Sequence, residues 1–370
     1  MSSPMQSSAA AIIGRIDDLL IDIFLFLPAR SLVRFKLVSK HWCSLISTHS
    51  FARLHILHHP RRCPEPQKSF ILSGWFPQFF ICHGFSRRLV RFNFRLPHVK
   101  ILQSCNGLLL LECRHSPFGT TLVYTILNPT TMQSRILIKR EAPLLLGLFF
   151  DPCKSPYYRV VCFEKNYRHR DLANTLSVFD SQTNTWKEEG TSPIRPDKFT
   201  IHSVVYWNNS VYILGSHHWL ISLSSDGNYR YIKRPRIGHR DGAEIRKYIM
   251  EANGHLHYLV LSLMAKDTYL VVYKMRHDGS GWLIKYTASF NPISVVRSFK
   301  CCLIGLVRGD KEEDSMVVFH MPGKIMVYRF LERTFKVLVN FKTEDYYEEG
   351  ELQFGLTKPA FPFIETLAHV

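Results

Sequence analysis

The sequence lacks an apolar run that is long enough to cross a bilayer. Its longest apolar stretch near the middle, residues 142–150, is far shorter than the ~20 residues of a transmembrane helix. The first eleven residues are mostly small and polar and include no basic side chain, whereas a secretory signal has a charged lead and a long apolar segment. We therefore expect a soluble intracellular protein, in the nucleus or the cytoplasm, with no membrane partner.

Paired cysteines are also missing. The nine cysteines are an odd number, none of them forms a CxxC pair, and a chain of 370 residues does not need disulfides to hold a small core together. This usage is typical of reduced thiols inside the cell.

The common signatures of catalysis do not occur: the sequence has no GxSxG elbow, no P-loop and no HExxH. One grouping suggests zinc, namely His55, His58, His59 and Cys63, with Cys82 further along. Its spacing matches no standard zinc finger, and exposed linker histidines explain it better. We predict no catalytic residue, no metal and no cofactor.

A dense cluster of one charge is absent too. Lysine and arginine total 47 against 30 acidic residues, which gives a formal charge of +17 and favours anionic partners. The closest basic grouping is Arg87, Arg88, Arg91, Arg95 and Lys100. A nucleic-acid site shows a denser patch of basic residues, so solvated loops and strand faces explain this scattered positive charge better. Nucleic acid is therefore not the expected partner.

What the chain does contain begins with a helical pattern at residues 17–27. Apolar residues recur at three- and four-residue steps from Leu19 to Leu27, and two aspartates lie in the first turn, where the helix dipole favours negative charge. Pro28 ends the pattern.

A second helical pattern follows, with Ser31 as the expected N-cap. Apolar residues recur from Leu32 to Leu45, and a break is expected near Val38-Ser39. A domain with so few helical residues buries little surface by itself. Part of its apolar surface is therefore expected to meet a partner. Periodicity alone equally allows these helices to pack only on the domain behind them.

Residues 16–46 read IDDLLIDIFLFLPARSLVRFKLVSKHWCSLI, and this stretch resembles the F-box of plant F-box proteins, most specifically in RFKLVSKHW at residues 34–42. In that family the F-box binds a Skp-type adaptor, which leads to a cullin scaffold and a ubiquitin-conjugating enzyme. The resemblance implies that the F-box core or its adaptor-facing surface is built by Leu19, Leu20, Ile23, Leu27, Pro28, Leu32, Phe35, Val38, Trp42 and Leu45.

The chain departs from the family pattern at Arg15-Ile16, where Leu-Pro is usual. Losing a proline at the first turn removes some pre-organisation, and arginine replaces an apolar contact. We expect adaptor binding to be weaker by roughly 1 kcal/mol but not abolished.

Beyond a proline- and charge-rich linker, short runs of β-branched, leucine and aromatic residues recur between turn signals, and no long amphipathic helix appears. Three Asn-Gly or Asn-Asn turns, at residues 106–107, 208–209 and 253–254, are typical of tight hairpins. A second kind of strand runs into a polar turn, and its end residues, spaced 44 to 55 apart, are Leu127, Phe179, Leu223, Tyr273 and Tyr328.

A recurrence near fifty residues with two hairpins in each unit predicts the four-stranded blades of a β-propeller. Five units are visible, and residues 69–95 supply another or close the ring. The alternative is a β-sandwich, which does not require this recurrence.

The same region resembles the F-box-associated, kelch-like domain of plant F-box proteins through SCNGLL at 104–109, LNPTT at 127–131, GLFFDP at 147–152 and VFDSQTNTW at 178–186. In that family the domain is thought to select the protein to be ubiquitinated. The predicted fold class is α+β overall, with a flexible N-terminus at 1–14, an F-box at 15–54, a linker at 55–68 and the β-domain at 69–370.

The predicted function is non-catalytic: the substrate-recognition subunit of a cullin-type (SCF) ubiquitin ligase, with an unknown target. Its target-binding residues are unassigned, although loops at 217–218 and 236–246 are candidates. The alternative is a propeller that binds nucleic acid or an anionic ligand independently of ubiquitination. A third possibility, an enzyme with a propeller pocket, needs convergent carboxylates or metal ligands that the sequence does not reveal.

Overall fold

The structure is a computed structural model that describes residues 16–58, 69–73, 78–82, 89–93, 99–114, 122–140, 145–164, 174–192, 201–215, 219–225, 227–236, 244–252, 254–263, 268–290, 302–307, 315–321, 324–340 and 360–370. The predicted flexible N-terminus lies outside these residues, and so do Arg15, the loop at 217–218 and most of the loop at 236–246. Among the described residues, no helix is both long and apolar enough to span a membrane.

The N-terminal domain consists of four short helices, α2 (Asp17–Leu25), α3 (Ala29–Phe35), α4 (Lys40–Ile46) and α5 (His49–His58). The break predicted near Val38-Ser39 in the second helical pattern is confirmed, because α3 ends at Phe35 and α4 begins at Lys40. Ser39 there caps α4, because its hydroxyl oxygen accepts a 3.1 Å hydrogen bond from the backbone N–H of Trp42.

Two local predictions in this domain were wrong. Helix α3 begins at Ala29 and follows Pro28, whose φ of −59° already suits a helix start, so Ser31 lies inside the helix rather than at its N-cap. Helix α5 continues through His58, so residues 55–58 are helical rather than linker. His55 is a buried residue with its ring Nε2 2.7 Å from the carbonyl oxygen of Leu27, and not an exposed linker histidine.

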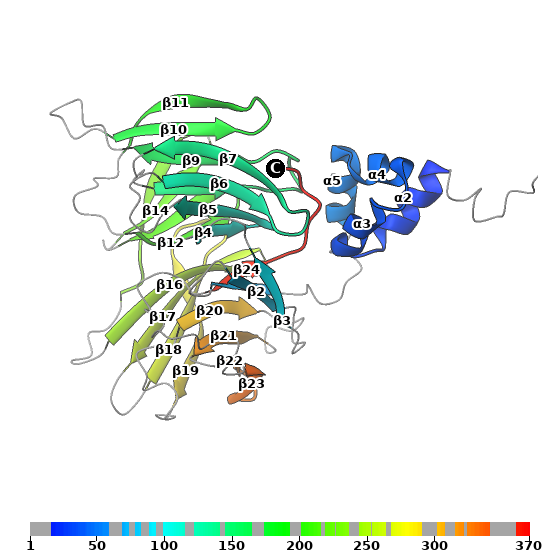
Figure 1. Cartoon of the computed structure of the whole chain (residues 1–370). Coiled ribbons are helices and arrows are strands. Elements are labelled where there is room, and N and C mark those ends of the chain that lie inside the picture. Colours follow the sequence, from blue (N-terminus) through cyan, green and yellow to red (C-terminus); the bar gives the residue numbers. More distant parts are fainter. Residues whose placement is uncertain are drawn as a thin grey trace, which may run out of the picture.

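The C-terminal domain consists of six four-stranded antiparallel sheets (Figure 1). We number the sheets as blades and give their strands from the innermost outward: blade 1 contains β24 (Ala360–Phe363), β1 (Ser69–Ser73), β2 (Gln78–Cys82) and β3 (Leu89–Asn93), and blade 2 contains β4 (Val99–Cys105), β5 (Leu108–Arg114), β6 (Leu122–Asn128) and β7 (Gln133–Arg140). Blade 3 contains β8 (Leu145–Phe149), β9 (Arg159–Glu164), β10 (Asn174–Asp180) and β11 (Thr185–Ser192), and blade 4 contains β12 (Ile201–Trp207), β13 (Ser210–Gly215), β14 (Trp219–Ser224) and β15 (Tyr229–Lys233). Blade 5 contains β16 (Glu244–Ala252), β17 (His255–Leu263), β18 (Thr268–Met275) and β19 (Trp282–Phe290), and blade 6 contains β20 (Cys302–Val307), β21 (Met316–Met321), β22 (Lys324–Arg329) and β23 (Thr334–Asn340).

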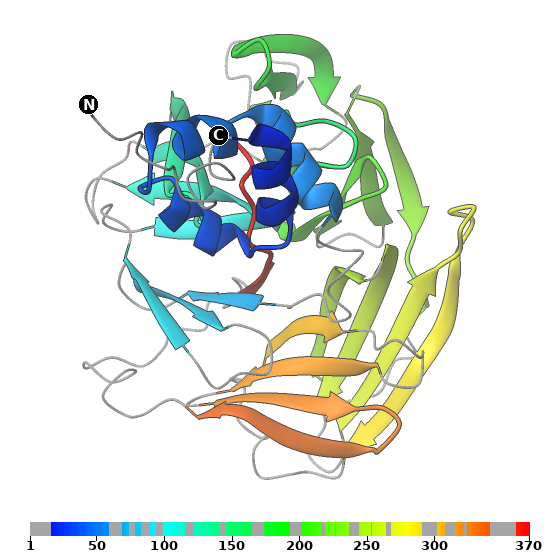
Figure 2. The same ribbon diagram turned by 90° about the vertical axis from the view of Figure 1, so that its right-hand side faces the viewer.

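The six sheets close into a ring, because the innermost strand of each blade contacts the innermost strand of the next (Figure 2). The ring is joined in blade 1, where β24 from the end of the chain pairs with β1. The predicted β-propeller is therefore confirmed and the β-sandwich alternative is wrong. Residues 69–95 do contribute a blade, but that blade is completed by a C-terminal strand.

The repeats seen in the sequence occupy equivalent places in the blades. The Asn-Gly and Asn-Asn turns join the first and second strands of blades 2, 4 and 5, and Asn106 and Asn208 have the positive φ values of 45° and 44° that such turns require. The strand-end residues Leu127, Phe179, Leu223, Tyr273 and Tyr328 all lie on the third strand of a blade.

The turns after the innermost strands share one side of the ring, which we call the near face. The indole N–H of Trp207 donates a 2.7 Å hydrogen bond to the carbonyl oxygen of Gly254, which links two of these turns. The turn at Gly107 contacts the C-terminal segment beside the helical domain. The innermost strands therefore begin on the opposite side, the far face.

Acid is expected to weaken the propeller through His320 on β21. Burial lowers the pKa of this imidazole from 6.5 to about 4. Between these two pH values the unfolded chain therefore binds a proton at His320 and the folded protein does not. Stability is fully present above pH 6.5 and falls as the pH drops toward 4, by roughly 2–3 kcal/mol at pH 4.5. Urea unfolding of wild type and of His320→Leu at pH 7.5 and 4.5 checks this, because the variant should lose that part of the pH dependence. An unchanged pH dependence in the variant would contradict it.

Candidate functional site

The helical domain is organised around one buried aromatic side chain, Phe24 of α2. Its ring centroid lies 5.0 Å from that of Trp42, 6.0 Å from that of Phe35 and 6.3 Å from that of Phe51. Because these partners come from α4, α3 and α5, all four helices share one core.

The ten residues singled out in the sequence fall into three groups in the structure. Leu20 and Leu32 are buried in the core. Leu27, Phe35, Trp42 and Leu45 are partly buried and pack against it. Leu19, Ile23, Pro28 and Val38 are exposed. This last group offers the most exposed surface to another protein in the fold as it stands.

The exposed apolar residues gather on two neighbouring parts of the domain. Leu19 and Ile23 of α2 and Phe26, its C-cap, are spaced four and three residues apart, so they follow one side of the helix, and they are 44%, 49% and 60% exposed. Leu37 and Val38, which are 88% and 61% exposed, occupy the turn between α3 and α4. We call these five residues the apolar face.

The turn and the helix are brought together by a polar contact at the edge of this face. The ring Nε2 of His41, at the start of α4, lies 2.9 Å from a carboxylate oxygen of Asp17 at the start of α2. The site residues selected from the sequence did not include Phe26 or Leu37, which are exposed in the structure. The three-residue step from Ile23 is the signal that identifies Phe26.

The apolar face lies away from the propeller, because a different helix contacts the propeller. Helix α5 lies between the propeller and the other helices, with α2 on the outer side (Figure 1). His49 and Ile56 of α5 border a small crevice whose other walls include Phe150 and Pro152 of blade 3. The domain therefore rests on the near face and leaves α2 open.

The C-terminal tail, residues 364–370, connects the two domains. Leu367 is buried within the core of the helical domain, in the same cluster as Phe24 and Leu32. Next to it the imidazole of His369 stacks on that of His49, with 4.2 Å between the ring centroids. Burial lowers the pKa of His369, and the neighbouring His49 and Lys36 lower it further, against a backbone hydrogen bond at Ser47 that raises it.

The propeller holds the other side of the tail through blade 2. The side-chain amide of Asn128, which is fully buried, donates to the carbonyl oxygens of Thr366 at 3.0 Å and Ala368 at 2.7 Å. The hydroxyl of Thr130 accepts a 3.1 Å hydrogen bond from the backbone N–H of Thr366. Such fully satisfied buried polar contacts fix the path of the tail, and so place the helical domain.

The other predictions about sites can be placed as follows. In the part of the chain that the structure describes, no group of three or more His, Cys, Asp or Glu side chains is arranged to hold a metal ion. Trp186, Trp207 and Trp282 pack within the blades as expected, whereas Trp219 is 45% exposed at the start of β14.

Comparison with known proteins agrees with this arrangement. Residues 17–54 match the F-box domain family. A relative from Arabidopsis thaliana, F-box protein At5g07610, is 30% identical over 421 residues, which cover 99% of this chain and 94% of that protein. F-box protein At5g49610 from the same plant is 28% identical over 356 residues, which cover 88% of this chain and 91% of that protein.

Likeness to solved structures is weaker. An oligogalacturonate lyase in complex with manganese is 12% identical and aligns over 75% of this chain and 74% of its own, with a TM-score of 0.38. Similarity of this size carries no argument about function.

Proposed function

The chain belongs to the F-box protein family, and from that premise we propose that it is the substrate receptor of a cullin-type ubiquitin ligase. The helical domain would bind a Skp-type adaptor, and the propeller, as an F-box-associated domain of the kelch-like kind, would bind the target. The chain itself would perform no chemistry.

The apolar face carries this proposal. Leu19, Ile23 and Phe26 are large, apolar and about half exposed, while the domain's own core is complete without them. Soluble domains seldom leave adjacent large apolar residues in water unless a partner covers them. Helix α2, which carries Leu19 and Ile23, lies on the outer side of the domain (Figure 1), so an adaptor there would not obstruct a target.

The tail supports the second half of the proposal. A receptor accelerates ubiquitin transfer by holding target lysines near the thioester of the conjugating enzyme, which is an effect of proximity. Proximity requires a fixed geometry between the adaptor site and the target site. Leu367 in one domain and the Asn128 hydrogen bonds in the other provide a rigid connection.

Trimming the apolar face is expected to weaken adaptor binding. Ile23→Ala removes three carbon atoms from the surface of α2 without opening the core, so the affinity for a purified plant Skp-type adaptor should fall about tenfold, or roughly 1.4 kcal/mol. Titration calorimetry with the full chain measures this directly.

The matched control is Leu331→Ala, an equally apolar truncation at a 61% exposed position in the turn between β22 and β23. This variant should bind the adaptor as wild type does. If wild type binds no Skp-type adaptor, or if both variants bind like wild type, the helical domain does not have the proposed role.

A further inference from the structure

A buried positive charge lies between blades 4 and 5, far from the helical domain. The guanidinium of Arg234, just beyond β15, is only 8% exposed and donates a 3.2 Å hydrogen bond to the carbonyl oxygen of Gly215 at the end of β13. Its remaining N–H groups have no carboxylate partner among the described residues. A buried guanidinium is costly unless an anion balances its charge, and the described residues place no carboxylate there.

A second positive charge lies beside it on the neighbouring blade. Lys247 of β16 is exposed, and it forms no ion pair within the part of the chain that the structure describes. Burial lowers the pKa of its ammonium group, and the charge of Arg234 lowers it further. Ile232, two residues before Arg234, and Ile245, two residues before Lys247, pack in the same cluster between blades 4 and 5, so the two cations lie at the same interface.

The nearest acid on the same strand does not relieve this repulsion. Successive residues of a strand point to opposite faces, so Lys247 shares a face with Ile245, which packs between blades 4 and 5. Glu244 and Arg246 belong to the other face, where they pair with each other at 2.7 Å. The positive charge is thus confined to one side of β16.

Two buried hydroxyl groups complete the cluster. Ser203 of β12 is 6% exposed and pairs in register with Leu214, next to the Gly215 carbonyl that Arg234 contacts. Tyr258 of β17 is fully buried beside Arg234, and burial raises the pKa of its phenol to about 12. The hydroxyl of Ser203 has no hydrogen-bond partner in the described structure, whereas the phenol oxygen of Tyr258 interacts with the guanidinium of Arg234. Both retain donor capacity that an anion can use.

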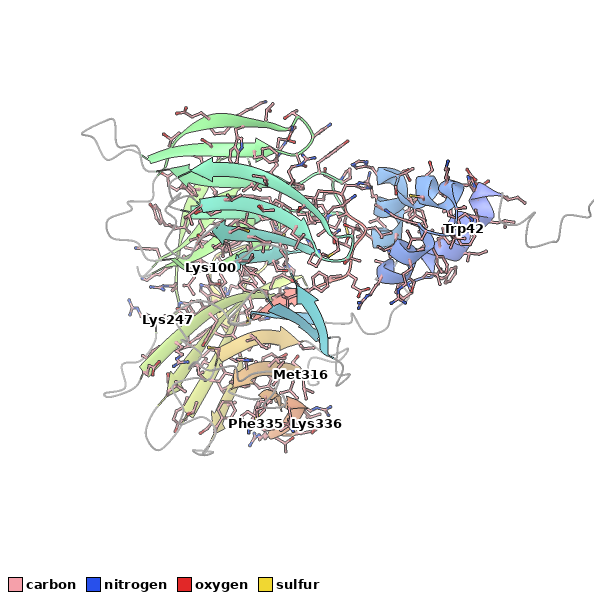
Figure 3. The ribbon with its side chains drawn as sticks, in the orientation of Figure 1. Trp42, Lys100, Lys247, Met316, Phe335 and Lys336 are labelled. Carbon is pink, nitrogen blue, oxygen red and sulfur yellow. The ribbon has the colours of Figure 1, made fainter. Side chains whose placement is uncertain are left out.

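We propose that Arg234 and Lys247, with Ser203 and Tyr258, form a binding site for an oxyanion, a carboxylate or phosphate group, between blades 4 and 5. An oxyanion would neutralise the two cations and accept hydrogen bonds from a planar guanidinium, an ammonium and neutral hydroxyls, the donor set such groups prefer. Lys247 lies on the side of the propeller opposite the helical domain (Figure 3).

The same chemistry can come from two sources, a free small anion or an acidic side chain of a bound protein. The site is independent of the adaptor, because none of its residues belongs to the helical domain or the tail. A failed search for this anion would therefore leave the adaptor-binding proposal intact, and the reverse also holds.

The test uses Lys247→Met in the full chain, which removes the charge and keeps the aliphatic stem. Inorganic phosphate, exchanged against chloride at constant ionic strength, should raise the melting temperature of wild type in a saturable way. Lys247→Met should weaken that response roughly tenfold. Without phosphate the same variant should melt about 1–2 °C higher than wild type, because the repulsion from Arg234 is gone.

The matched control is Lys336→Met. Lys336 is an exposed lysine on β23 and is also labelled in Figure 3. This variant should leave the response within about twofold of wild type. Ser203→Ala, which should not disturb folding, is expected to weaken the response as well. Saturation by phosphate alone identifies a free anion as the ligand. Saturation by a poly-glutamate peptide only, with the same dependence on Lys247, identifies an acidic protein segment. If neither probe saturates, or if both lysine variants respond alike, there is no such site.

Discussion

Truncating one leucine near the end of the chain, Leu367→Ala, is expected to loosen the whole helical domain while the propeller stays folded. Leu367 is 3% exposed and is part of the core around Phe24. Removing such a side chain typically costs 2–5 kcal/mol, and so small a domain has little stability in reserve. Amide hydrogen exchange in α2 to α5 should therefore accelerate at least ~30-fold, and up to ~5,000-fold, with blade amides unchanged.

Ile364→Ala is the control for this prediction. Ile364 belongs to the same tail but is 56% exposed, so its truncation should leave exchange in the helical domain nearly unchanged. If both variants accelerate exchange equally, or if the blades exchange faster as well, the tail does not act as a local support for the helices. A Leu367→Ala chain should also bind a Skp-type adaptor more weakly, because part of the binding energy is then spent on ordering the helices.

The sequence predicted the repeated parts of this protein because each repeat carries its own local signal. Asn106 and Asn208 mark tight turns, and residues such as Leu127 and Phe179 mark the third strand of their blades. Helix α2 was predicted from its apolar period and from the proline that follows it. In each of these cases, the residues that determine the structure lie within a few positions of one another.

The parts that were missed depend on contacts between residues far apart in the chain. Blade 1 takes its innermost strand from residues 360–363, and no local pattern indicates that Phe361 pairs with Ile71. Nothing in the tail distinguishes Leu367, which is buried in another domain, from Ile364, which is exposed. Similarly, local patterns do not show that Arg234 and Lys247 face the same interface, because that depends on how blades 4 and 5 pack against each other.

The candidate site divides in the same way. Periodicity identified the helices that carry Leu19, Ile23 and Trp42, but it does not separate residues that fill the core from residues that stay exposed. That separation follows from which side of each helix the other three cover, and from α5 rather than α2 contacting the propeller. Leu20 and Leu32 are therefore poor choices for testing adaptor binding, because replacing either one would disturb the fold itself.

A loss of stability of the same size is expected from Gly107→Ala, at the turn between β4 and β5. Gly107 has a φ of +90°, and an added Cβ would lie 2.5 Å from the carbonyl oxygen of Ile364 and even closer to a methyl group of Thr366. The left-handed backbone costs an alanine about 1–2 kcal/mol, and the overlap costs about 1–3 kcal/mol more, since a backbone carbonyl has little room to move. The melting temperature of the full chain should fall accordingly.

Gly254→Ala separates the two contributions. Gly254 occupies the equivalent turn of blade 5 with a φ of +72°, but no atom lies within 4 Å of its added Cβ. This variant should therefore show only the backbone cost. Exchange of the Thr366 amide, which donates to Thr130 in the native structure, should accelerate in Gly107→Ala and remain slow in Gly254→Ala. Equal losses of stability in the two variants would mean that the tail moves away from the added methyl group without a loss of free energy. The tail would then not fix the helical domain on the near face.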